Sequence, residues 1–217
     1  SFPYLLFNIV SIEKLLILIT SGDYALAYAG HLNINTDNTI IGNMIPKKQK
    51  GIIFGELLKQ FDIPIVTSMV STQHLLKSGL LFDDNIHASE EYCLFMQLAV
   101  KNCFIADNEF VTKYRIHDNA LTNKTVYKWS NERRYTLDKI IKENFDIRRV
   151  YQKEFKEAYA RADYYEVRFL LSLDKKKEAK DLLRSHIFKD IRYFIIYLML
   201  FFPKSLRNYI FRKKYSR

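Results

Sequence analysis

Glycine, proline and cysteine are scarce in this chain of 217 residues, and each shortage excludes a class of protein. Six glycines and four prolines are too few for a β-sandwich, whose many short strands need turn residues at their connections. The two cysteines, Cys93 and Cys103, form no CxxC pair and have no histidine at metal-ligand spacing. They are interpreted as two free thiols in a reducing compartment, rather than a disulfide framework or a zinc site.

Motifs that mark several large enzyme classes are also missing. The sequence holds no GxGxxG, no Walker loop and no HExxH, so it lacks the common signatures of dinucleotide binding, nucleotide hydrolysis and zinc proteolysis. Apolar residues are plentiful: they make up 48% of the chain, with 15 tyrosines and 16 phenylalanines. This composition predicts a folded chain, either one domain with an appendage or two small domains.

The basic charge of the chain is concentrated at one end. Of the formal net charge of +10, residues 184–217 carry +8, from nine lysines and arginines and one acidic residue. The longest apolar run, Tyr193–Phe202, has ten residues, whereas a transmembrane helix needs about 20. Residues 184–217 therefore predict a helix that lies on an anionic membrane, at the cytoplasmic face of the cell membrane. The alternative is a helix packed on the protein with a basic end.

Nucleic-acid binding by the same segment is disfavoured. A groove that binds phosphates needs basic residues interleaved with the other side chains. The uninterrupted apolar run Tyr193–Phe202 does not have this pattern. We therefore expect no nucleic-acid partner.

Hydrophobic periodicity changes near Asn123. Before this residue helical and strand patterns alternate, whereas after it the pattern is helical only. We predict an α/β domain over residues 1–122 and an all-helical extension over residues 123–217. The predicted helices are 12–20, 51–60, 72–78 (ended by Gly79), 90–100 (capped by Ser89), 127–143, 151–173 and 175–183. The predicted strands are 24–28, 32–35 paired with 40–41 as a hairpin, a central strand 65–70, and two final strands 104–107 and 111–115.

The first candidate site is a pair of adjacent carboxylates, Glu90 and Glu91, at the start of an apolar helix. A helix N-terminus favours negative charge, and a carboxylate there can take the proton of an attacking hydroxyl group. The simpler interpretation is that both acids only cap the helix.

The second candidate site is Tyr114-Arg115-Ile116-His117, at the end of the last predicted strand. The planar guanidinium of Arg115 suits phosphate oxygens, and the imidazole of His117 can bind a divalent cation or donate to a diphosphate. The simpler interpretation is an ordinary surface or core histidine.

In this order, the two motifs resemble the C-terminal half of the catalytic domain of family 2 glycosyltransferases. The segments Gly51–Leu58, Ile65–Val70 and Leu76–Asp83 also follow the run of that family, so the resemblance covers residues 12–122. It implies a GT-A (Rossmann-like) fold. It also implies a reaction that moves a sugar, with inversion, from a nucleotide-sugar donor to a saccharide or lipid-linked acceptor, in bacterial surface polysaccharide synthesis.

The resemblance assigns roles residue by residue. Glu91 matches the general base, although the family has Asp there, and Glu90 is its alternative. Arg115 and His117 would face the donor diphosphate. His117 would also be a ligand of a divalent cation, Mn²⁺ or Mg²⁺.

The nucleotide-binding half of such a domain, with its Asp-x-Asp metal motif, has no counterpart in the sequence. Asp37 lies in the predicted hairpin turn, and Asp83-Asp84 precedes the acid helix. We therefore expect this chain to be a partial domain that is inactive alone. Two alternatives come from other classes: a non-catalytic binding or accessory module that docks through its helices and basic tail, and a basic helical nucleic-acid binder.

Overall fold

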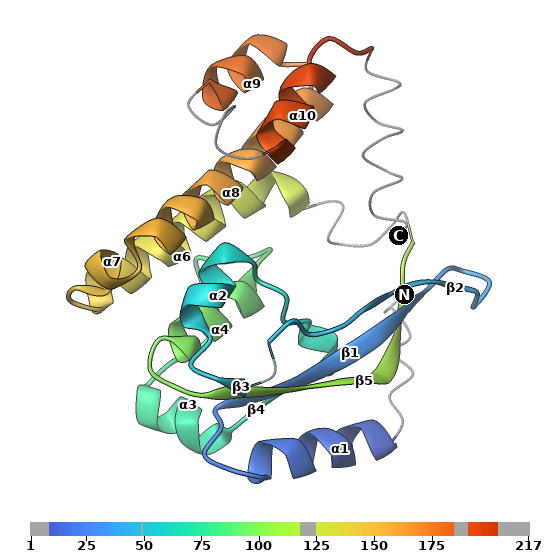
Figure 1. The fold of residues 1–217 in the computed structure, drawn as a ribbon, viewed down its shortest axis with the longest axis vertical. Coiled ribbons are helices and arrows are strands. Elements are labelled where there is room, and N and C mark those ends of the chain that lie inside the picture. Colours follow the sequence, from blue (N-terminus) through green and yellow to red (C-terminus); the bar gives the residue numbers. More distant parts are fainter. Residues whose placement is uncertain (1–8, 49, 118–124, 185–190, 204–217) are drawn as a thin grey trace. The chain divides into compact units, whose positions relative to one another are not determined.

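The computed structural model of the chain describes residues 9–48, 50–117, 125–184 and 191–203 (Figure 1). The chain divides into two compact units. Unit 1 comprises Ser1–Ile86 and Glu90–Ala120, and unit 2 comprises His87–Ser89 and Leu121–Arg217. Unit 1 combines strands with helices, so the predicted α/β class is confirmed.

Unit 1 is built on a five-stranded mixed sheet. Its two long strands, β1 (Leu26–Ile34) and β5 (Phe104–Arg115), run parallel to each other. β2 (Ile40–Met44) pairs antiparallel with β1, which confirms the predicted hairpin. β3 (Lys50–Gly51) pairs antiparallel with β5, giving the order β2-β1-β5-β3, and β4 (Ser68–Val70) pairs with β1 off this path.

Helices cover both faces of this sheet (Figure 1). On one face, α1 (Ile9–Thr20) packs Leu15 and Ile19 against side chains of β1 and β5. On the other face lie α2 (Phe54–Lys59) and α4 (Glu90–Ala99), whose apolar side chains are buried. The short helix α3 (Thr72–Ser78) ends at Gly79, where a φ of 64° favours glycine and confirms the predicted stop.

One predicted strand, 65–70, is wrong as a central strand. Residues Ile65–Thr67 form a turn of 3₁₀ helix, and only Ser68–Val70 is extended, paired with β1 alone. Two hydroxyl groups stabilise this bend: Thr67 Oγ1 donates to the carbonyl of Ala29 at 2.6 Å, and Ser68 Oγ donates to the carbonyl of Pro64 at 2.6 Å. The β-branched composition indicated burial, but these local hydrogen bonds decided the backbone conformation.

The two predicted final strands, 104–107 and 111–115, are one strand, β5. The pairing with β1 steps from Ala29–Asp107 to Gly30–Phe110, so the intervening residues form a bulge and not a break. β1 is continuous as well, where two shorter strands were predicted. Gly30 lies at this step, and a Cβ there would come within 2.8 Å of the Met44 carbonyl oxygen.

The described residues of unit 2 are helical apart from their connections. The helices are α6 (Trp129–Glu143), α7 (Ile147–Val150), α8 (Gln152–Ser172), α9 (Lys176–Leu183) and α10 (Ile191–Met199). This confirms the helices predicted over 127–143, 151–173 and 175–183. Among the described helices, none has both the length and the apolar character needed to cross a membrane.

Ion pairs and apolar packing both stabilise the described part of unit 2. α6 packs along α8, and Arg134 of α6 forms ion pairs with Asp163 and Glu166 of α8. A separate apolar cluster joins α8, α9 and α10, and its buried members are Ala160, Val167, Leu171, Ala179, Leu183, Tyr193 and Leu200.

Candidate functional site

The acid pair opens α4 as predicted. Glu90 and Glu91 are half-buried in the first turn, and every side chain from Tyr92 to Ala99 is buried. The ring of Tyr92 meets that of Phe61 edge to face, with centroids 5.0 Å apart. The two carboxylates are therefore set at the positive end of a helix that is fixed in the core of unit 1.

The three residues before this helix are held by a carboxylate that was not predicted from the sequence. Glu132 of α6, only 7% exposed, accepts hydrogen bonds from the backbone N–H groups of His87 and Ala88, both at 3.0 Å. It also accepts one from the Ser89 hydroxyl at 2.8 Å. Ser89 was predicted to cap α4, and this capping stays a prediction; the contact seen for its hydroxyl is the donation to Glu132. A single glutamate in a polar helical stretch carries no sequence signal for such a contact.

Arg115 ends β5, and its guanidinium is held by the turn that joins β1 to β2. Nη1 donates to the carbonyls of Asn35 and Thr36 at 2.8 and 3.1 Å, and Nη2 donates to Asn38 Oδ1 at 2.7 Å. Asn38 has a φ of 65°, so the side-chain contact supports a left-handed turn residue. A diphosphate bound to Arg115 would have to share these donors with the turn.

His117 follows β5 by two residues and is half-buried. Its neighbour Ile116 still donates from its backbone N–H to the carbonyl of Ile34, at 2.9 Å, so the chain remains attached to β1 up to this point. A second histidine, His31 of β1, contacts the same motif: its ring meets that of Tyr114 edge to face, with centroids 5.6 Å apart. His31 is buried, and burial lowers its pKa. His31 was not predicted as a site residue from the sequence.

The two predicted motifs lie on consecutive elements of unit 1: the acid pair opens α4, and Arg115 ends β5. In Figure 1, α4 lies on one face of the sheet, and β5 follows it in the chain. Within the described ranges, no group of three His, Cys, Asp or Glu side chains is positioned to hold a metal ion. His117 is thus the one residue here assigned to the predicted cation.

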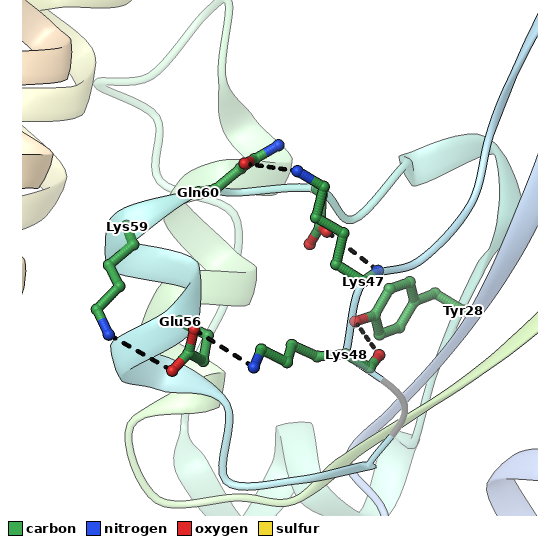
Figure 2. Close-up of polar contacts among 7 residues, drawn as sticks. Tyr28, Lys47, Lys48, Glu56, Lys59 and Gln60 are labelled. Carbon is green, nitrogen blue, oxygen red and sulfur yellow. Dashed lines mark hydrogen bonds and ion pairs between the residues drawn. The ribbon is translucent and has the colours of Figure 1, made fainter. Parts of the chain in front are cut away.

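A second polar site in unit 1 surrounds Lys47 and Lys48, in the loop between β2 and β3 (Figure 2). The Nζ atom of Lys48 lies 3.5 Å from Glu56, which also pairs with Lys59 at 3.5 Å. Three hydrogen bonds anchor the loop. Lys47 donates from Nζ to Gln60 Oε1 at 2.8 Å and from its backbone N–H to Asp62 Oδ2 at 3.3 Å. The Tyr28 hydroxyl donates to the Lys48 carbonyl at 3.0 Å.

These contacts hold the loop in place, and they leave its lysines poorly suited to bind an anion. Its lysines already have protein acceptors, so a phosphate would have to displace Glu56 or Gln60. Burial raises the pKa of the Tyr28 phenol, and the Asp62 carboxylate acts in the same direction. Burial also raises the pKa of Asp62 itself.

No protein-family profile matches this sequence, and no curated protein matches it. The residues themselves therefore carry what can be inferred about function.

Proposed function

We propose that this chain is the acceptor-side part of a GT-A glycosyltransferase domain of family 2, followed by a helical extension. The proposed reaction transfers a sugar, with inversion, from a nucleotide-sugar donor to a hydroxyl group of a saccharide or lipid-linked acceptor. The observation that supports it most is the helix–strand unit of α4 and β5. This unit opens on Glu90-Glu91 and ends on Tyr114-Arg115, in the order that the resemblance implies.

In this proposal Glu91 is the general base. Its carboxylate takes the proton of the acceptor hydroxyl as that oxygen attacks the sugar, while the nucleoside diphosphate leaves from the opposite side. The first turn of α4 suits this role, because the helix dipole stabilises a carboxylate in its charged form. Glu90, in the same turn, is the alternative base.

Arg115 and His117 are assigned to the donor diphosphate. The divalent cation that the resemblance implies would neutralise the leaving diphosphate. Among the described residues, no group of three His, Cys, Asp or Glu side chains is positioned to hold such an ion. The cation is therefore expected only with the Asp-x-Asp half, and no step of the reaction is assigned to it here.

A non-catalytic binding or accessory module is the second candidate. The observation that favours it is the guanidinium of Arg115, whose donors are engaged by the β1–β2 turn. In this case the acid pair would only stabilise the start of α4.

The test places Glu91→Gln and Glu90→Gln in a protein that joins this chain to a nucleotide-binding half carrying Asp-x-Asp. Glu91→Gln is expected to lower the rate of sugar transfer by about 10²–10⁴-fold, as loss of a general base does. Donor affinity should stay unchanged, because the base acts on the acceptor. If only Glu90→Gln is inactive, the base is Glu90. Full transfer by both variants would reject the catalytic role and favour the binding module.

A further inference from the structure

Helix α10 packs one of its sides into the core of unit 2. Tyr193 and Leu200 are 6% and 7% exposed and belong to the apolar cluster with α8 and α9. Tyr197 packs against the same cluster. These three positions are four and three residues apart, so they form one stripe along the helix.

The opposite side of α10 is apolar as well. Phe194, Ile195 and Leu198 are 41%, 49% and 44% exposed. At about 100° per residue, they point away from the stripe of Tyr193 and Leu200. Two further exposed aromatic residues, Phe201 and Phe202, continue the chain beyond the helix. We call Phe194, Ile195, Leu198, Phe201 and Phe202 the outer face of α10.

The neighbouring helix α9 shows the usual arrangement for a surface helix. It buries Ala179 and Leu183 in the same cluster, but its exposed positions hold lysine, glutamate and aspartate. The apolar outer face of α10 is therefore not a general feature of this unit. A contiguous exposed apolar surface is one of the features of an interaction site, and the residues that follow it in the sequence supply a second.

Basic residues follow this face directly in the sequence. Residues 204–217 contain six lysines and arginines and no acidic residue. An apolar helix face that is followed in the sequence by a basic stretch has the two properties that bind an anionic bilayer surface: apolar side chains for the headgroup boundary and cations for lipid phosphates.

We propose that the outer face of α10 rests on the surface of an anionic membrane, with Phe194, Ile195 and Leu198 inserted at the headgroup boundary and residues 204–217 binding the lipid headgroups. α10 has nine residues and its other side is packed, so it lies on the bilayer and does not span it. A second copy of the chain is a poorer occupant. A stable protein interface buries about 800 Å² per partner, far more than one side of a nine-residue helix offers. This inference does not depend on the proposed glycosyl transfer.

The test is vesicle flotation of the full chain, with vesicles of phosphatidylcholine plus phosphatidylglycerol and vesicles of phosphatidylcholine alone. The wild-type chain is expected to float with the anionic vesicles and to lose this binding as salt is raised. The triple variant Phe194→Gln, Ile195→Gln, Leu198→Gln should weaken partitioning by about 10- to 100-fold, because it removes only the inserted side chains. The variant Arg212→Gln, Lys213→Gln, Lys214→Gln should weaken it by about 100-fold on anionic vesicles.

A matched control lies in unit 1. Ile12, Leu16 and Ile17 of α1 are 49%, 52% and 63% exposed, and changing all three to glutamine should leave flotation unchanged. Circular dichroism and thermal unfolding show that each variant is folded. The proposal is overturned if the α10 variant floats as well as the wild type, or if the wild type binds both vesicle types equally. It is also overturned if the α10 variant abolishes self-association in sedimentation and leaves flotation intact, because the face then binds a second copy.

Discussion

The hydroxyl of Ser89 donates a hydrogen bond of 2.8 Å to the carboxylate of Glu132, a residue 43 positions further along the chain. The backbone N–H groups of His87 and Ala88 donate to the same carboxylate. One buried side chain therefore binds three consecutive residues, and these are the residues that lead into the acid pair of α4.

The first prediction concerns this carboxylate. Glu132→Gln keeps the shape of the side chain but replaces one acceptor oxygen with an amide NH₂ group. This group cannot accept the hydrogen bonds that residues 87–89 donate. The substitution should lower the free energy of unfolding by about 1–3 kcal/mol, as loss of a buried hydrogen-bond acceptor does. Urea titration followed by circular dichroism measures this. Glu143→Gln, at an exposed position of the same helix, is the control and should change stability by less than about 0.5 kcal/mol.

The second prediction concerns the ion pairs between α6 and α8. Arg134→Leu leaves Asp163, which is 8% exposed, and Glu166 without this cation. It should destabilise the chain by about 1–3 kcal/mol, because hydrogen bonds to charged groups are lost in a partly buried setting. The matched control is Arg149→Leu, whose side chain is 80% exposed and pairs with Asp146. A loss of stability in the control as large as that of Arg134→Leu would contradict the importance of the buried network.

The third prediction concerns pH. Burial lowers the pKa of His31 below its ordinary value of 6.5, so the folded chain keeps this imidazole neutral where the unfolded chain protonates it. The unfolded state then binds more protons below about pH 6.5, and stability falls as the pH drops through this window.

His31→Phe removes this titration and keeps an aromatic ring beside Tyr114. The fall in urea midpoint between about pH 7 and pH 5 should be smaller in this variant than in the wild type. His87→Gln, at an exposed position, is the control and should keep the wild-type fall. An equal fall in His31→Phe and the wild type would show that other groups cause the acid sensitivity.

The fourth prediction follows from the proposed function. The chain of residues 1–217 should not bind nucleotide sugars, because the half that would hold the nucleotide is missing from it. Calorimetry with UDP- and GDP-sugars in the presence of Mn²⁺ measures this. Binding in the micromolar range would mean that the donor site lies within this chain, and the proposed division of the domain would be wrong.

Local patterns determined much of this fold in advance. The helical periods of residues 127–143, 151–173 and 175–183 predicted α6, α8 and α9, and Gly79 predicted the end of α3. The acid pair at the start of an apolar run predicted the start of α4. These features depend on residues a few positions apart, whose interactions are already present within a single helical turn or cap.

Only the tertiary structure decided the features that depend on distant partners. β5 continues across its bulge because β1 pairs with it on both sides of the irregular step, and residues 65–70 bend because Thr67 donates to the carbonyl of Ala29. The burial of Glu132 and the packing of one side of α10 have the same origin. A sequence pattern can mark a side chain as polar or apolar, but which group lies opposite it depends on how the whole chain folds.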